Sequence, residues 1–126
     1  SKVSYNAVVS QQGGLELLAP WTKRAWHAGM CRPSDLRLPY RDANSAFEGI
    51  ALAASAGDKV THAAFTRLVA LIRERFQVHG WSLTDTWRIR GHNTEAWPRG
   101  RKVDPEGPDP QHPVLAVALL RTALLD

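Results

Sequence analysis

Apolar and polar residues alternate at the start of the chain. The stretch VSYNAVV, residues 3–9, places four side chains on one face of an extended strand: Val3, Tyr5, Ala7 and Val9. QQGG at 11–14 is typical of a hairpin turn, and LELLAP follows it, so the region predicts a β-hairpin. FEGIALAAS (47–55) predicts a buried strand, and TDTWRIR (84–90) predicts another strand.

A helical period replaces this alternation between Thr61 and Gly80. Apolar side chains recur there at i, i+3, i+4, i+7 and i+11: Phe65, Leu68, Val69, Ile72 and Phe76. Thr61 suits the N-cap and Gly80 the helix end, so the stretch predicts a helix that packs on a sheet through this stripe. VLAVALLRTALL (114–125) predicts a closing helix with Pro113 in its first turn.

The order of these elements predicts an α/β fold, with a central mixed β-sheet flanked by helices in a single domain over residues 1–126. Residues 30–46 are predicted to form a long loop. No apolar run approaches the roughly 20 residues needed to span a bilayer, so a membrane partner is not expected. The oligomeric state is not predicted.

Composition narrows the class of partner. The net charge of +4 and the pI near 9.7 favour a polyanion such as nucleic acid, anionic lipid or the bacterial cell wall. Basic residues are spread along the chain and do not follow one helix or groove, which makes nucleic acid the weaker choice. Cys31 is the single cysteine, so no internal disulfide is possible and the redox compartment stays open.

Candidate chemistry gathers in GHNTEAWPRGRKVDPEG, residues 91–107. Pro105 favours an extended backbone at Asp104, and a carboxylate beside the imidazole of His92 suits zinc. Spacing alone leaves other interpretations open. His92 could be a polar cap, Asp104 a turn residue and Lys102 part of a solvated basic face.

The motifs taken together resemble a known family. GH, a loop with an acidic residue and a proline, and then GRKVDP resemble the C-terminal signature of zinc-dependent N-acetylmuramoyl-L-alanine amidases. This type 2 amidase family includes phage lysozyme-amidases and peptidoglycan recognition proteins. The strand VSYNAVV, RAWHAG (24–29) and ANS (43–45) leading into GIAL resemble further segments in the same order. The resemblance implies a zinc enzyme that cleaves peptidoglycan between N-acetylmuramic acid and L-alanine, in a phage endolysin, periplasmic or secreted setting.

The resemblance also implies residue roles. His92 and Asp104 would be zinc ligands, while Lys102 and Tyr5 would stabilise the oxyanion. Glu95 would orient His92 by accepting a hydrogen bond, although a solvated carboxylate is an equally good interpretation. The expected substrate-binding residues are His27, Trp26, Asn44 and Trp97, of which Trp26 is also compatible with simple packing.

The chain departs from the family at several positions. Asn6 stands where histidine is common, and Ala51 where some members carry a catalytic glutamate, so the chemistry would depend on Tyr5 and Lys102. The first zinc histidine of the family lies on a strand upstream of the VSY hairpin, where this sequence has only two residues, so either the N-terminal strand is missing from the sequence or the third ligand comes from elsewhere. None of the other histidines is a convincing replacement: His27, His62, His79 and His112. A metal-free peptidoglycan-binding module and a phage structural protein therefore remain alternatives.

Overall fold

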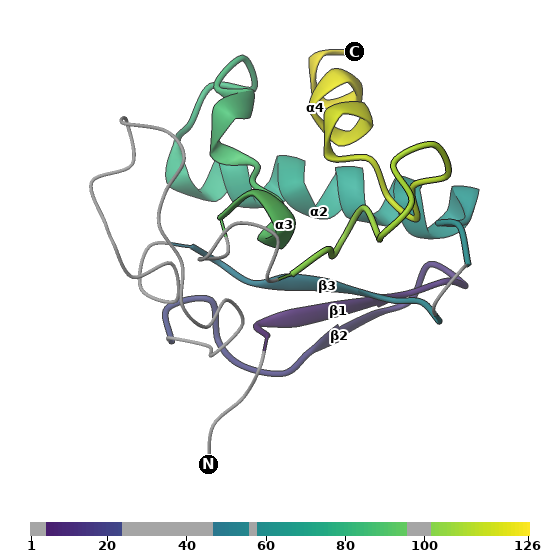
Figure 1. Ribbon diagram of the computed structural model, residues 1–126. Coiled ribbons are helices and arrows are strands. Elements are labelled where there is room, and N and C mark those ends of the chain that lie inside the picture. Colours follow the sequence, from purple (N-terminus) through teal and green to yellow (C-terminus); the bar gives the residue numbers. More distant parts are fainter. Residues whose placement is uncertain (1–4, 24–46, 56–57, 96–101) are drawn as a thin grey trace.

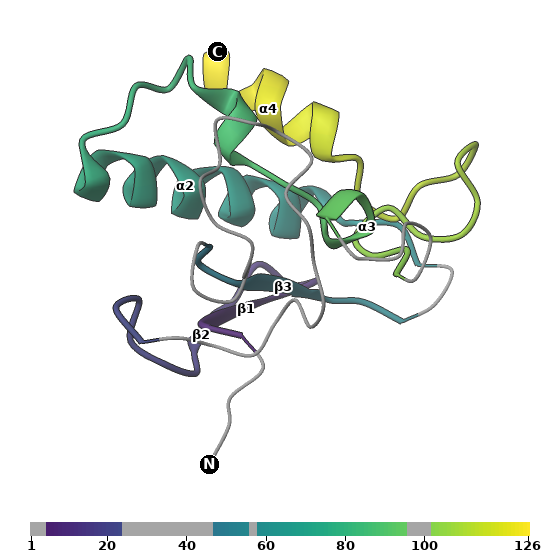
Figure 2. The ribbon, with the colours of Figure 1, turned by 60° about the vertical axis from the view of Figure 1, so that its left-hand side comes forward.

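The computed structural model describes residues 5–23, 47–55, 58–95 and 102–126. A sheet forms the lower layer in Figure 1, helix α2 (His62–His79) crosses it, and helix α4 (Val117–Leu125) lies on the other side of α2. Figure 2 shows the same three tiers from a second direction. No helix in the described part is long and apolar enough to cross a membrane. The loop predicted at 30–46 lies outside the described residues.

The sheet contains the predicted hairpin. Strand β1 (Ala7–Ser10) pairs antiparallel with β2 (Leu15–Leu17) and parallel with β3 (Ile50–Ala53), in the order β2–β1–β3. The described sheet is therefore mixed, as predicted. Gly13 turns the hairpin with a φ of 85°, a conformation that favours glycine.

The prediction of a buried strand at 47–55 is only partly correct. β3 exists, but its first three residues are half-buried and Ala53 is exposed. The reason is the position of α2, which packs over β1: Ala7 and Val9 in β1 are fully buried, and β3 is an outer strand of the described sheet.

Helix α2 matches its prediction at both ends. The hydroxyl oxygen of Thr61 accepts a hydrogen bond from the Ala64 N–H at 3.1 Å, which satisfies one of the free donors of the first turn. Gly80 ends the helix in the left-handed conformation with a φ of 70°. Most of the predicted stripe is buried, and Phe65 packs partly buried against the same core: Leu68, Val69, Ile72 and Phe76.

The closing helix begins later than predicted. Its first residue is Val117, so the placement of Pro113 in the first turn is wrong. The backbone of Val114 is already used elsewhere, because its N–H donates to the Glu106 carbonyl and its carbonyl accepts from the Val60 N–H, both at 2.8 Å. A residue whose backbone N–H and carbonyl both bond other segments in this way cannot also belong to a helical turn.

The strand predicted at 84–90 is also wrong. Thr86–Arg88 form a short 3-10 helix, and its turn hydrogen bonds are local, such as Arg88 N–H to the Asp85 carbonyl at 3.1 Å. Trp87, the tryptophan of the predicted strand, instead stacks on a cation that it shares with Trp81, since the Arg88 guanidinium lies 4.4 Å from the Trp87 ring and 4.3 Å from the Trp81 ring.

Candidate functional site

The structure brings His92 and Asp104 together. His92 opens the one-turn helix α3 (His92–Glu95), and its Nδ1 lies 3.1 Å from Oδ2 of Asp104. The predicted approach of these two side chains is therefore confirmed. The hydrogen bond with His92 holds the pKa of Asp104 below its ordinary value against the opposing effect of burial, and the charges of His92 and Lys102 act in the same direction. Asp104 is thus an ionised carboxylate at neutral pH, the form that binds metals.

Tyr5 and Lys102 belong to the same site. Tyr5, two residues before β1, is half-buried, and burial together with the negative charge of Asp104 raises the pKa of its hydroxyl. The phenol therefore keeps its proton and remains a hydrogen-bond donor. Lys102 is exposed, and its positive charge contributes to the lowered pKa of Asp104. Two parts of the chain far apart in sequence thus supply the site: Tyr5 brings a phenol, and the 91–107 stretch brings an imidazole, an ammonium and a carboxylate.

The His92–Asp104 pair has the chemistry and spacing of two zinc ligands. Two donors at about 2.0–2.1 Å from a tetrahedral zinc ion lie about 3.3 Å from each other. The observed 3.1 Å between Nδ1 and Oδ2 is close to that value. Within the described ranges, no third histidine, cysteine or acidic residue joins the pair. The described residues therefore fit part of a zinc site.

A second layer of contacts supports the pair. The Asn93 N–H donates to the Asp104 carbonyl at 2.7 Å, and the Asn93 side-chain amide donates to Oε2 of Glu106 at 3.1 Å. Gly91 is buried directly before His92, where an added Cβ would collide with Oδ1 of Asn93 and meet Cδ of Pro105 at 3.2 Å. A larger residue at this position would therefore force the Asn93 side chain to move.

The remaining predicted site residues lie outside the description. His27, Trp26, Asn44 and Trp97 are not among the described residues, and the Glu95 side chain is not described either. Their assigned roles stay predictions.

The other described histidines lie away from the His92–Asp104 pair: one is exposed and two contact other carboxylates. His62 is exposed at the start of α2, and Nδ1 of His112 lies 2.9 Å from the Asp109 carboxylate. Nε2 of His79 lies 2.8 Å from the Glu48 carboxylate.

Asn6 is a supporting residue whose role the sequence did not reveal. It is 1% exposed, and its amide donates to the carbonyls of Pro20 and Lys23, both at 3.0 Å. Its Oδ1 accepts from the Gly49 N–H at 2.9 Å. The Asn6 side chain therefore ties the backbone next to Tyr5 to the 20–23 turn and to the residues just before β3. The available signal was a polar amide within an apolar strand pattern.

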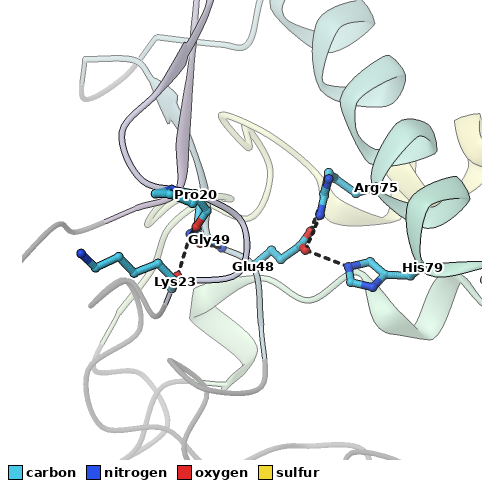
Figure 3. A network of polar contacts seen from close by, with 7 residues as sticks. Pro20, Lys23, Glu48, Gly49, Arg75 and His79 are labelled. Carbon is cyan, nitrogen blue, oxygen red and sulfur yellow. Dashed lines mark hydrogen bonds and ion pairs between the residues drawn. The ribbon is translucent and has the colours of Figure 1, made fainter.

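Glu48 extends this support to α2. Its carboxylate accepts two hydrogen bonds from Arg75, at 2.9 and 2.8 Å, and a third contact joins it to His79 (Figure 3). Burial opposes ionisation, but the hydrogen bonds from Arg75 and His79 outweigh it and lower the pKa of Glu48. The Arg75 guanidinium also lies 4.5 Å from the Trp21 ring, so this tryptophan is packed against a cation. The start of β3 is thereby tied to the end of α2.

Comparison with known proteins agrees with the resemblance seen in the motifs. Residues 1–107 match the N-acetylmuramoyl-L-alanine amidase family, and the chain belongs to that family. A crystal structure of a selenomethionine AmpD derivative matches with a TM-score of 0.75 and 25% sequence identity. The match covers 98% of this chain and 60% of the AmpD chain, so this chain spans less than two thirds of that relative. It confirms the α/β fold. No curated protein matches the chain.

Proposed function

We propose that the protein is a peptidoglycan hydrolase that cleaves the amide bond between N-acetylmuramic acid and L-alanine. The observation that carries the proposal is the 3.1 Å approach of His92 to Asp104, next to the phenol of Tyr5 and the ammonium of Lys102. Membership of the amidase family supplies the reaction class.

His92 and Asp104 would hold the zinc ion, with a further ligand from residues beyond those described. Bound zinc supplies a Lewis acid and lowers the pKa of a coordinated water to roughly 7. The lowered pKa of Asp104 suits this role, because a ligand that stays ionised does not have to lose a proton when metal binds.

Tyr5 and Lys102 would act on the substrate carbonyl. Attack on an amide turns its carbonyl oxygen into an oxyanion, and donors already in place stabilise that charge by about 3 kcal/mol each. Tyr5 keeps its proton because its pKa is raised, and Lys102 brings a positive charge. Ala51 offers no carboxylate where some amidases carry a glutamate, so the stabilisation falls to these two residues.

Two substitutions separate metal binding from catalysis. Lys102→Ala should leave zinc content unchanged, because a protonated amine cannot be a ligand, and should lower turnover by about a hundredfold. Asp104→Ala should lose both zinc and activity. Lys59→Ala, an exposed lysine that precedes α2, is the matched control and should change neither.

The assay is amide cleavage of purified cell walls, measured by mass spectrometry of the released peptides, with zinc content determined on the same samples. Wild-type turnover in Lys102→Ala would remove the lysine from the mechanism. Wall binding without any cleavage by the zinc-loaded wild type would instead identify a binding module and refute the hydrolase.

A further inference from the structure

We propose that Glu106 is a positioning residue: by joining α3 to α4, it holds the side chains of His92 and Asp104 in their positions relative to each other. The inference rests on the proposed function, because it concerns the zinc-binding pair of that site. Glu106 lies two residues after Asp104 and is half-buried, and none of the roles implied by the amidase motifs falls on it.

The first half of the argument is the link from Glu106 to the pair. Oε2 of Glu106 accepts from the side-chain amide of Asn93, the residue after His92, at 3.1 Å. The backbone N–H of Asn93 donates to the Asp104 carbonyl at 2.7 Å. Asn93, which follows His92, is therefore bonded both to the main chain of Asp104 and to the side chain of Glu106.

The orientation of the Asn93 amide depends on Glu106. Oδ1 of Asn93 is buried and has no hydrogen-bond partner among the described residues. An amide with one unsatisfied end keeps its orientation only if the other end is well bonded, and turning it over would place Oδ1 against the Glu106 carboxylate. Removing this carboxylate removes the interaction that holds the amide.

The second half is the anchor in the core. Oε1 of Glu106 accepts from the N–H of Val117, the first residue of α4, at 3.3 Å. The N-cap residue Ala116 provides no side-chain cap, so Glu106 supplies an acceptor that the helix start lacks. Helix α4 is fixed in turn, since Leu120 is 4% and Leu124 is 1% exposed. The carboxylate of Glu106 thus connects the packed helix α4 to the segment that carries His92 and Asp104.

Amide hydrogen exchange tests this link without zinc or substrate. In Glu106→Ala the Asn93 amide should exchange faster, because its bond to Asp104 loses its support, while core amides such as that of Leu68 should keep their rates. Asp109→Ala is the matched control, since Asp109 is an exposed carboxylate on the same segment, bonded to His112, and should leave Asn93 unchanged. Zinc affinity, measured by chelator competition, should fall about tenfold in Glu106→Ala only.

Two results would overturn the inference. One is unchanged exchange at Asn93 in Glu106→Ala. The other is faster exchange with unchanged zinc affinity, which would make Glu106 a purely structural contact. If Glu106→Ala does not fold, Glu106→Gln replaces it, and the same two results apply to that variant. Failure of the proposed hydrolase would show separately, as absence of wall cleavage by the wild type while the Asn93 amide still exchanges faster in Glu106→Ala than in Asp109→Ala.

Discussion

Replacing Asn6 by alanine should be one of the most destabilising single changes in the chain. The substitution removes the side-chain partner of three backbone groups, the Gly49 N–H and the carbonyls of Pro20 and Lys23, although the Pro20 carbonyl keeps its hydrogen bond from the Lys23 N–H at 2.9 Å. A buried polar group that loses its partner costs about 1–3 kcal/mol. Gly49 is buried and bears the full cost, whereas Pro20 and Lys23 are exposed and water replaces part of theirs. The expected loss is about 3 kcal/mol in the free energy of unfolding.

Thermal and urea unfolding followed by circular dichroism measure this loss. At about 4 °C per kcal/mol for a domain of this size, the midpoint should fall by about 12 °C. Asn6→Asp keeps the acceptor for Gly49 but turns an oxygen toward two carbonyls, so it should be at least as damaging at neutral pH. Gln12→Ala in the exposed hairpin turn is the control and should cost less than about 0.5 kcal/mol. A loss below about 1 kcal/mol in Asn6→Ala would show that water substitutes freely and would refute the reasoning.

Two further predictions concern the site and the residues that support it. In Gly91→Ala the loss of zinc-binding free energy should exceed the loss of unfolding free energy, because the new Cβ meets Asn93 and Pro105 next to His92. Equal zinc affinity in the variant and the wild type, measured by chelator competition, would contradict this prediction. The folded-state pKa of Glu48 is lowered, so its stabilising contribution is present above the unfolded-state pKa and is lost as pH falls through the folded-state value. Urea unfolding between about pH 6 and 3 should therefore show a smaller acid-induced loss of stability in Glu48→Gln than in wild type or in the exposed control Glu74→Gln, and identical pH profiles would reject the role of Glu48.

Local periodicity accounts for the elements that the sequence predicted correctly, since the hairpin and helix α2 follow from patterns within about twenty residues of chain. The approach of His92 to Asp104 was predicted from the resemblance of the 91–107 stretch to the amidase signature, because spacing alone left other interpretations open. The strand predicted at 84–90 failed because tryptophan and isoleucine suit both a strand and a cation-stacking turn, and the choice depends on Arg88 lying between two rings. The contacts of Asn6 with Gly49 and of Glu48 with Arg75 join residues 43 and 27 positions apart, and no local pattern specifies such partners.

The contact between Glu106 and Val117 bears on where this domain can be cut. The family match stops at residue 107, ten residues before α4 begins, and a truncated protein designed from that boundary would omit α4 altogether. Yet Leu120 and Leu124 of α4 share a core with Ala7 and Val9 of β1, and the start of α4 is bonded to the turn that carries Asp104. The folding unit is therefore longer than the shared motif. A chain ended at 107 would keep every residue assigned to the chemistry and lose the helix against which those residues are aligned.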